Sequence, residues 1–429
     1  MATAAVAPTT QTTAPQRNPY DILAERGFVY QCSDTEGLRR ALAAGPLTAY
    51  YGVDPTAPSL QIGNIVPLMA LAHLQRAGHR VIVIVGGGTA MIGDPTDRSA
   101  ARRIMSREEI QANAAAARRQ LAGLLDLTEG RGLMVDNAEW LLELKYIEFL
   151  RDYGRYFSVN EMLRMETYRT RLEEGLTFLE FNYALLQAYD FLELYRRYGC
   201  TLQVGGSDQW ANILAGVDLI RRAEGALAFA LTTPIITDAS GQKMGKTAGG
   251  QTVWLDPELM SPYDFYQYWI NTDDRDVARY LAIFTFLPMD EIRALTSVTG
   301  EALRPAKERL AFEVTRLIHG EALAREAQAA SRLLFGRASE EDLAAAESVP
   351  SAEIDRARLE QGIAAVDLLV ETGLAGSKSA ARRLIEQGGA YLHGERLQMR
   401  PITTADLRNG ILLLRKGKKH YLRVVPTAR

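Results

Sequence analysis

Short apolar runs alternate with helical patterns in the first hundred residues. Residues 49–53 form an apolar run that ends at Asp54, and residues 80–85 are β-branched and apolar on both faces, as in a buried parallel strand. Between them, residues 62–77 have helical periodicity, which stops at Gly78, a residue that commonly ends helices. This order predicts a doubly wound α/β domain with a parallel sheet, whose ligand lies at the carboxyl ends of the strands.

The rest of the chain is mostly helical in pattern. We expect helices at residues 18–45, 106–126 and 140–198, strands at 202–205 and 232–236, further helices from 260 to 347, two short helices at 365–373 and 377–388, and strand pairs at 389–396 and 411–425. A chain of 429 residues is long for one core. We therefore predict a disordered segment at 1–17, a Rossmann-like domain at 18–250 with a helical insertion at about 140–198, an α-helical domain at 251–347, a linker at 348–362 and a small α+β domain at 363–429.

Charge is distributed unevenly between these parts. The chain carries a net charge of −3, yet residues 363–429 hold 12 Lys and Arg against 5 Asp and Glu, a local charge of +7 that leaves −10 for the rest. A basic terminal domain indicates either a polyanion-binding appendage or an ordinary solvated face, and charge alone does not separate the two. The two cysteines, Cys32 and Cys200, have neither metal-site nor disulfide spacing, which favours a reducing compartment.

Two motifs about 180 positions apart suit a nucleotide. Residues 54–64, Asp-Pro-Thr-Ala-Pro-Ser-Leu-Gln-Ile-Gly-Asn, lead from a strand end to a helix start, and residues 243–247, Lys-Met-Gly-Lys-Thr, place two lysines and a hydroxyl in a loop. A helix N-terminus offers free N–H groups and a partial positive charge to phosphates. Lysines neutralise the charge that develops on a departing pyrophosphate. Together the motifs predict a site for a nucleoside triphosphate that is attacked at its α-phosphate.

One helical stripe is unusually polar. Tyr183, Gln187 and Asp190 are spaced i, i+4 and i+7, so one face of a helix presents all three side chains to the same place. A stripe with this spacing is more often core packing, but Tyr, Gln and Asp together are too polar for an ordinary core. We therefore predict that the stripe faces a binding pocket.

Six motifs in order make the chain resemble the bacterial tyrosyl-tRNA synthetases of class I, from about residue 21 to residue 421. They are Tyr-Tyr-Gly-Val-Asp-Pro-Thr at 50–56, Gly-Asp-Pro at 93–95, Phe-Asn-Tyr at 181–183 with Gln187 and Asp190, Gln-Val-Gly-Gly-Ser-Asp-Gln-Trp at 203–210, Lys-Met-Gly-Lys-Thr at 243–247 and Ile-Asn-Thr-Asp-Asp-Arg-Asp at 270–276. The C-terminal domain resembles an S4-type RNA-binding domain. One lysine loop would be weakly informative, whereas six ordered matches are specific.

The resemblance implies a tyrosine–tRNA ligase that acts in two steps. ATP and L-tyrosine form tyrosyl-adenylate and pyrophosphate, with Mg²⁺ accompanying the nucleotide, and the tyrosyl group then passes to the 3′-terminal adenosine of tRNA(Tyr). Catalysis would rest on positioning and electrostatics without a protein nucleophile, and no tightly bound, protein-ligated metal is expected. The resemblance also implies a homodimer. The cysteine pattern and the lack of any apolar run as long as a membrane span lead us to expect a cytoplasmic location and no membrane association.

Roles for individual residues follow from the same resemblance. Tyrosine binding is implied for Tyr50, Asp94, Tyr183, Gln187, Asp190 and Gln203. ATP binding is implied for Asp54, Thr56, Gln61, Gly63, Asn64, Gly206, Asp208, Gln209 and Lys246, and catalysis for Lys243, Lys246, Thr247, Thr56, Gln61 and Asn64. Contacts with tRNA are implied for Arg98, Arg102, Lys378, Arg382, Arg383, Arg415, Lys416, Lys418 and Lys419. Tyr50 and Asp190 would bind the phenolic hydroxyl and reject phenylalanine, which leaves both of them unpaired.

The chain departs from the family pattern in its first motif, where Gln61 and Asn64 replace the two usual histidines. Both amides keep a neutral donor for phosphate and ribose, but neither can carry the charge of an imidazolium. This change bears on how strongly the motif stabilises the transition state rather than on whether it binds ATP.

Three alternatives stay open at this point. A sister enzyme for tryptophan shares the fold, but an indole has no hydroxyl to match Tyr50 and Asp190. A catalytically inactive RNA-binding paralogue is favoured only by Gln61 and Asn64. A nucleotide-dependent oxidoreductase is disfavoured, because the Gly-Gly-Gly turn at 86–88 lacks the dinucleotide-binding spacing.

Overall fold

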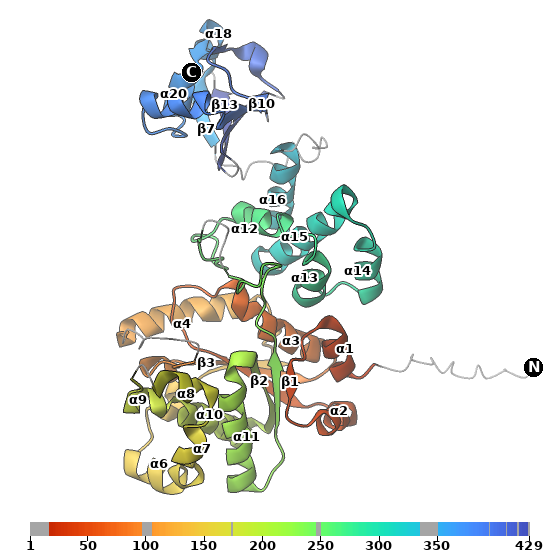
Figure 1. Cartoon of the computed structure of the whole chain (residues 1–429), viewed down its shortest axis with the longest axis vertical. Helices are drawn as coiled ribbons and strands as arrows, with labels where there is room; N and C mark the ends of the chain where they lie inside the picture. The colour runs from red at the N-terminus through yellow and green to blue at the C-terminus, as the bar shows by residue number, and fades with distance from the viewer. Residues whose placement is uncertain are drawn as a thin grey trace, which may run out of the picture. The chain divides into compact units, whose positions relative to one another are not determined.

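The computed structural model describes residues 17–96, 105–172, 175–245, 250–334, 351–393, 395–408, 410–417 and 420–427 (Figure 1). These residues form two compact units. The first takes the described residues up to Asp256 together with Asp273–Ser297, and the second takes Pro257–Thr272 and the described residues from Val298 onward. The segment expected to be disordered lies outside the described residues except for Arg17.

A six-stranded sheet organises the described part of the first unit. Its strands are β1 (Gln31–Cys32), β2 (Thr48–Val53), β3 (Arg80–Val85), β4 (Gly132–Asp136), β5 (Cys200–Gly206) and β6 (Phe229–Thr233). They lie in the order β1-β6-β5-β2-β3-β4, and all neighbours are parallel except β1 and β6. The chain winds outward from β2 in both directions, which confirms the doubly wound prediction and places a topological switch point between β2 and β5.

Helices cover both faces of this sheet. The helices in the described part of the first unit are α1 (Pro19–Arg26), α2 (Thr35–Ala44), α3 (Ile65–Arg76), α4 (Arg107–Ala122), α5 (Ala138–Leu141), α6 (Tyr146–Asp152), α7 (Val159–Met162), α8 (Glu166–Leu172), α9 (Phe178–Phe181), α10 (Tyr183–Tyr198), α11 (Trp210–Glu224), α13 (Val277–Phe284) and α14 (Met289–Leu295), with 3₁₀ turns η1 (Ile62–Asn64), η2 (Thr89–Met91), η3 (Gly154–Tyr156) and η4 (Ser207–Gln209). Figure 1 shows α3 and α4 on one side of the sheet and α10 and α11 on the other. Ten of the twelve residues of α3 are buried, since this helix crosses the middle strands.

The second unit contains a group of helices and a small α+β module. The helices are α12 (Pro262–Ile270), α15 (Arg304–His319) and α16 (Glu321–Leu334), with the turn η5 (Gly300–Leu303). The module has β7 (Ser351–Asp355), α18 (Arg356–Gln361), β8 (Ile363–Ala364), α19 (Ala365–Glu371), α20 (Lys378–Glu386), β9 (Ala390–Leu392), β10 (Glu395–Arg396), β11 (Pro401–Ile402), η7 (Thr404–Asp406), β12 (Leu412–Lys416) and β13 (His420–Thr427). Five of its strands form a sheet in the order β10-β9-β12-β13-β7, and β8 pairs with β11.

The structure differs from the expected boundaries in two places. The segment 351–362, expected as linker, forms β7 and α18, and β7 pairs in parallel with β13 at the sheet edge. Its sequence, Ser-Ala-Glu-Ile-Asp, gives no clear strand pattern, because an edge strand is held by backbone hydrogen bonds more than by apolar side chains. The segment 273–297, expected in the helical domain, belongs to the first unit, where α13 packs on α1 and α3. The rest of the domain boundaries stay a prediction.

The sequence patterns also missed two strands of the first unit. β1 has two residues within the stretch expected to be helical, and β4 lies among glycines that favour a loop. Each is an edge strand, and pairing with β6 or β3 decides its conformation.

Among the helices of the described residues, none is both long and apolar enough to cross a membrane.

Candidate active site

A cavity of about 320 Å³ opens at the carboxyl ends of the parallel strands, beside the switch point. Fifteen residues that the sequence predicted to act on tyrosine, ATP or the reaction line it: Tyr50, Asp54, Thr56, Gln61, Gly63, Asn64, Asp94, Tyr183, Gln187, Asp190, Gln203, Gly206, Asp208, Gln209 and Lys243. Segments far apart in the sequence therefore meet here, and the polar stripe of α10 faces the cavity.

The cavity has two ends that differ in exposure to solvent. We call the side chains of Tyr50, Asn137, Gln187, Asp190 and Gln203 the buried end. We call the residues Thr56, Gln61, Gly63 and Lys243 the exposed end. Asp190 and Gln203 are 4% and 3% exposed, whereas all four residues of the exposed end are open to solvent.

Asp190 is the central acid of the buried end. Its Oδ2 accepts a hydrogen bond from Asn137 Nδ2 at 2.9 Å, and its Oδ1 accepts one from Trp140 Nε1 at 2.7 Å. Burial raises the pKa of Asp190 to about 8, although the two hydrogen bonds act in the opposite direction. The carboxyl group is thus held in a fixed orientation in a place of low polarity.

Three polar atoms of the buried end are available to a ligand. The Tyr50 hydroxyl, Gln187 Oε1 and Gln203 Oε1 are buried and have no hydrogen-bond partner within the described ranges of the chain. The Tyr50 ring packs on Phe191, with the ring centroids 5.1 Å apart. Burial, and then the charge of Asp190, raise the pKa of Tyr50 well above its ordinary value, so its hydroxyl keeps its proton. A ligand that pairs these atoms would remove the cost of burying them unpaired.

Asp54 joins the end of β2 to two other elements. Its Oδ1 accepts from Thr89 Oγ1 at 2.6 Å, and its Oδ2 accepts from the Tyr183 hydroxyl at 2.9 Å. Asn137 Nδ2 donates to Thr89 Oγ1 at 2.9 Å, so the network continues to the buried end. Gly86 permits this close approach, because a Cβ at that position would lie 2.0 Å from Asp54 Oδ1.

Asp94 makes a second link across the switch point. Its Oδ1 accepts from the N–H and the hydroxyl of Thr96, at 2.9 and 2.6 Å, and its Oδ2 accepts from Gln209 Nε2 at 2.7 Å. Gln209 lies just before α11, beyond β5, whereas Asp94 follows β3. The loops after these two strands are therefore connected by side chains.

The two nucleotide motifs meet at the exposed end. The Ile62 N–H donates to the Val253 carbonyl at 3.1 Å, and the Val253 N–H donates to the Gly245 carbonyl at 2.9 Å. Gly245 has φ +132°, and a Cβ there would lie 3.3 Å from Gln61 Oε1. The Gln61 N–H donates to Asn64 Oδ1 at 3.0 Å. Backbone hydrogen bonds thus hold the lysine motif close to Gln61.

Some residues with predicted roles lie outside the described residues. They are Arg98, Arg102, Lys246, Thr247, Lys418 and Lys419. In the C-terminal module, Arg382, Arg383 and Lys416 are exposed, and Lys378 forms an ion pair with Asp367 at 2.7 Å. The Arg415 guanidinium lies 3.8 Å from the centroid of the Tyr391 ring.

Sequence reasoning missed three residues of the network: Thr89, Asn137 and Trp140. Asn137 is 1% exposed and also accepts from the Gly88 N–H at 2.8 Å. Its signal was weak, because it follows β4, a strand that the pattern did not indicate. An Asp-Asn pair at a strand end would have been the clue, had β4 been recognised.

Comparison with known proteins agrees with this architecture. The family model "tRNA synthetases class I (W and Y)" matches residues 42–336, and the model of the SYY-like C-terminal domain of tyrosine–tRNA ligases matches residues 342–424. The tyrosine–tRNA ligases of Syntrophus aciditrophicus and Clostridium kluyveri are 51% and 49% identical to this chain, over 95% of it in each case and over 98% and 99% of the relative.

Solved structures give the same result. A C-terminally truncated mitochondrial tyrosyl-tRNA synthetase from Aspergillus nidulans matches with a TM-score of 0.68 at 32% identity, over 74% of this chain and 94% of that chain. A tryptophanyl-tRNA synthetase from Encephalitozoon cuniculi, with a TM-score of 0.55 and 16% identity over 76% of this chain and 89% of that chain, shares the fold alone. From the family model and from relatives that align over nearly their whole length, we conclude that the chain belongs to the class I tRNA synthetases of the W and Y family.

Proposed function

We propose that this chain ligates L-tyrosine to tRNA(Tyr) at the expense of ATP, with tyrosyl-adenylate as intermediate and pyrophosphate and AMP as products. The observation that carries the choice of tyrosine is the buried end of the cavity. There an acid of raised pKa, Asp190, and an unpartnered hydroxyl, that of Tyr50, both line the space that a side chain would enter.

The chemistry of a phenol suits these two groups. A phenolic hydroxyl has one proton to donate and lone pairs to accept with, so it can bond to Asp190 and Tyr50 together. Phenylalanine would leave the Tyr50 hydroxyl buried without a partner, at a cost of about 1–3 kcal/mol, and would give Asp190 no bond beyond those from Asn137 and Trp140. The indole of tryptophan offers a donor but no oxygen, so it would leave the Tyr50 hydroxyl without an acceptor.

Activation would take place between the two ends. A carboxylate oxygen of tyrosine attacks the α-phosphorus of ATP, a bond forms between them, and the bond from the α-phosphorus to the β-phosphate oxygen breaks. Lys243 at the exposed end would neutralise charge on the departing pyrophosphate, together with Lys246 and Thr247. Gln61 and Asn64 would donate hydrogen bonds from their amides to phosphate or ribose. Holding both substrates in line supplies most of the rate.

Magnesium is expected to arrive with the nucleotide and to neutralise phosphate charge there. Among the described residues no group of three or more His, Cys, Asp and Glu could hold a metal ion. In the second reaction, a ribose hydroxyl of the terminal adenosine attacks the tyrosyl carbonyl carbon and AMP leaves.

Exchange of pyrophosphate into ATP tests the activation step directly. The purified protein is assayed without tRNA and with tyrosine, tryptophan or phenylalanine in turn. Exchange that depends on tyrosine alone supports the proposal. Exchange with tryptophan alone would make the chain a tryptophan enzyme, and no exchange with any of the three, in a folded protein that binds ATP, would indicate an inactive paralogue.

The C-terminal module would hold the tRNA. Arg382 and Arg383 are exposed on α20, where guanidinium groups can contact phosphates without reading bases. Replacing both by alanine should weaken tRNA binding and flatten its salt dependence while leaving pyrophosphate exchange unchanged. Arg358→Ala is the matched control, because Arg358 is paired with Glu371 in the same module. Unchanged tRNA affinity in the double variant would make this basic helix a plain solvated face.

The expected homodimer is also part of the proposal. Large apolar side chains are exposed between residues 140 and 190, among them Ile147 at 73% and Phe178 at 68%. Sedimentation should give a dimer, and Ile147→Asp should shift it toward monomer. A wild-type monomer at micromolar concentration would contradict this assembly. The cytoplasmic location stays a prediction.

A further inference from the structure

Lys243 belongs to a short hairpin that begins after β6. The Met244 N–H donates to the Ile236 carbonyl at 2.7 Å, and Thr237 pairs with Lys243 in an antiparallel bridge. The place of Lys243 beside the cavity therefore depends on where the opposite strand, residues 236–238, is held.

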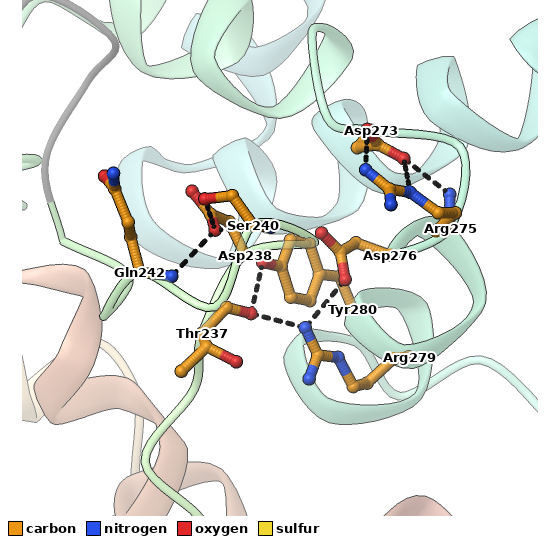
Figure 2. A network of polar contacts seen from close by, with 9 residues as sticks. All are labelled: Thr237, Asp238, Ser240, Gln242, Asp273, Arg275, Asp276, Arg279 and Tyr280. Atoms are coloured by element: carbon orange, nitrogen blue, oxygen red, sulfur yellow. Dashed lines mark hydrogen bonds and ion pairs between the residues drawn. The ribbon is translucent and has the colours of Figure 1, made fainter.

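The turn of the hairpin is closed by its own side chains. Asp238 Oδ1 accepts from Ser240 N, Ser240 Oγ and Gln242 N, and the Asp238 N–H donates to the Gln242 carbonyl at 2.8 Å (Figure 2). Gly241 has φ 85°, which such a tight turn requires. These bonds make the hairpin a rigid unit, but none of them fixes it to the rest of the protein.

Helix α13 supplies the anchor. The Thr237 carbonyl accepts a hydrogen bond from Arg279 Nη2 and another from the Tyr280 hydroxyl at 3.0 Å (Figure 2). Thr237 is the residue that pairs with Lys243, so both donors act on the strand directly opposite the lysine. A carbonyl oxygen with two donors, one of them charged, is held more firmly than one with a single neutral donor.

The anchor is itself held in place. Arg279 Nη2 also donates to Asp276 Oδ1 at 2.7 Å, and Asp276 is only 5% exposed. At the other end of α13, the buried Arg26 donates to the carbonyls of Thr285 and Leu287. Helix α13 is therefore tied to the N-terminal helix at one end and to the lysine hairpin at the other.

We propose that Arg279 and Tyr280 are positioning residues that place Lys243 against the phosphates of ATP by holding the Thr237 carbonyl. This inference rests on the proposed function of Lys243. A shift of about 1 Å in a group that acts on developing charge can cost up to roughly 10² in rate, so the two hydrogen bonds have a large effect at a distance. Neither residue is among the described residues that line the cavity.

The first experiment compares three single variants in single-turnover formation of tyrosyl-adenylate. Arg279→Ala should slow the step about tenfold and Tyr280→Phe about threefold, whereas tyrosine affinity measured without ATP stays unchanged. Arg275→Ala is the matched control: its guanidinium pairs with Asp273 in the same segment, and its only link to the hairpin is the weak electrostatic attraction of Asp238, without a hydrogen bond (Figure 2). Equal effects of Arg275→Ala and Arg279→Ala would overturn the proposal, as would a rate unchanged in Arg279→Ala.

A double-mutant cycle tests whether Arg279 acts through the lysine. In a Lys243→Ala background the added Arg279→Ala change should slow adenylate formation less than about twofold, because there is no ammonium left to position. A further tenfold loss in that background would mean that Arg279 acts by another route. If Arg279→Ala does not fold, Tyr280→Phe, which removes one hydroxyl, goes through the same cycle.

Hydrogen exchange separates this inference from the proposed function. Amides of residues 236–245 should exchange faster in Arg279→Ala and in Tyr280→Phe than in the wild type and in Arg275→Ala, whatever the enzyme activates. Unchanged protection of these amides would overturn the anchoring itself. A wild type that shows no tyrosine-dependent exchange of pyrophosphate, but does show this loss of protection, would refute the proposed function and the role of the anchor in catalysis while leaving the contact established.

Discussion

The two ends of the cavity are built by different means. At the buried end, side chains hold side chains: Asn137 and Trp140 orient Asp190 from two directions, and all of these groups are shielded from water. At the exposed end, hydrogen bonds hold the backbone: Val253 bridges Ile62 and Gly245, and the side chains of Arg279 and Tyr280 hold the lysine hairpin through the Thr237 carbonyl. The first arrangement fixes atoms within a low-dielectric place, and the second fixes a segment whose charged side chains stay in water.

This difference matches two separate tasks. Selection between similar amino acids needs hydrogen-bonding groups that are costly to leave unpaired, and that cost arises only where water is excluded. Neutralising a large phosphate charge that enters and leaves needs cations at a place that the nucleotide can reach. We infer that substitutions at one end should affect one task and spare the other, and the following predictions test that separation.

The largest effect is expected for Lys243→Ala. Loss of the ammonium should slow adenylate formation by roughly 10²- to 10³-fold, because a group that acts on developing charge is removed. Tyrosine affinity should stay within about twofold of the wild type, since the buried end is untouched. Single-turnover kinetics and equilibrium dialysis with tyrosine measure the two quantities. A parallel loss of tyrosine affinity would show that the ends are coupled.

Asp190→Asn should have the next largest effect, on the other task. One oxygen becomes an amide N–H₂ that must face the donor of Asn137 or Trp140, and the ligand loses a carboxyl oxygen as its partner. Tyrosine affinity should fall roughly 10- to 100-fold, and the preference for tyrosine over phenylalanine should shrink. ATP affinity, measured in the same titrations, serves as the control and should not change. Full discrimination in the variant would remove Asp190 from the recognition of the phenol.

Asn137→Ala removes one of the two hydrogen-bond donors that orient the Asp190 carboxyl group, and its effect should be smaller. Its amide bonds to both Asp190 and Thr89, so its loss should weaken tyrosine binding by about tenfold while the rate of adenylate formation at saturating tyrosine changes little. Asn182→Ala is the control, because the Asn182 amide donates to the Phe178 carbonyl and does not line the cavity. If both variants bind tyrosine equally well, the network does not act on the ligand.

The smallest expected effect is on the stability of the free protein as pH changes. The pKa of Asp190 is about 8 in the folded state, above its ordinary value of 3.8. Below about pH 4 both states hold the proton, and between pH 4 and 8 the unfolded chain releases it while the folded protein keeps it. Stability should therefore fall as pH rises through this window and level off above it.

Thermal melting of the wild type and of Asp190→Asn from pH 5 to pH 8 measures this contribution. The difference in melting temperature between the two proteins should change by a few degrees in favour of the variant as pH rises. A difference that stays constant with pH would mean that the carboxyl group is ionised throughout the window.

Patterns in consecutive residues predicted those helices and strands whose conformation depends on nearby residues. The strand at 80–85, the helix that stops before Gly78 and the polar stripe of α10 were all readable, because burial on both faces, helix termination and i, i+4, i+7 spacing leave a signal in consecutive residues. The edge strands β1, β4 and β7 left no such signal, since pairing with a neighbour decides their conformation. Asn137 and Trp140, which orient Asp190, were missed for the same reason, because both follow β4.

The sequence by itself determined the residue types that tyrosine and ATP require, the order of the motifs and the family to which the chain belongs. Only the tertiary structure decided which distant groups act together: Asn137 and Trp140 reach Asp190 across 53 and 50 residues, and Arg279 reaches Thr237 across 42. Each of these contacts depends on the order of strands in the sheet and on how α13 packs. Side-chain hydrogen bonds need donor and acceptor within about 3 Å, and no spacing along the chain encodes that distance.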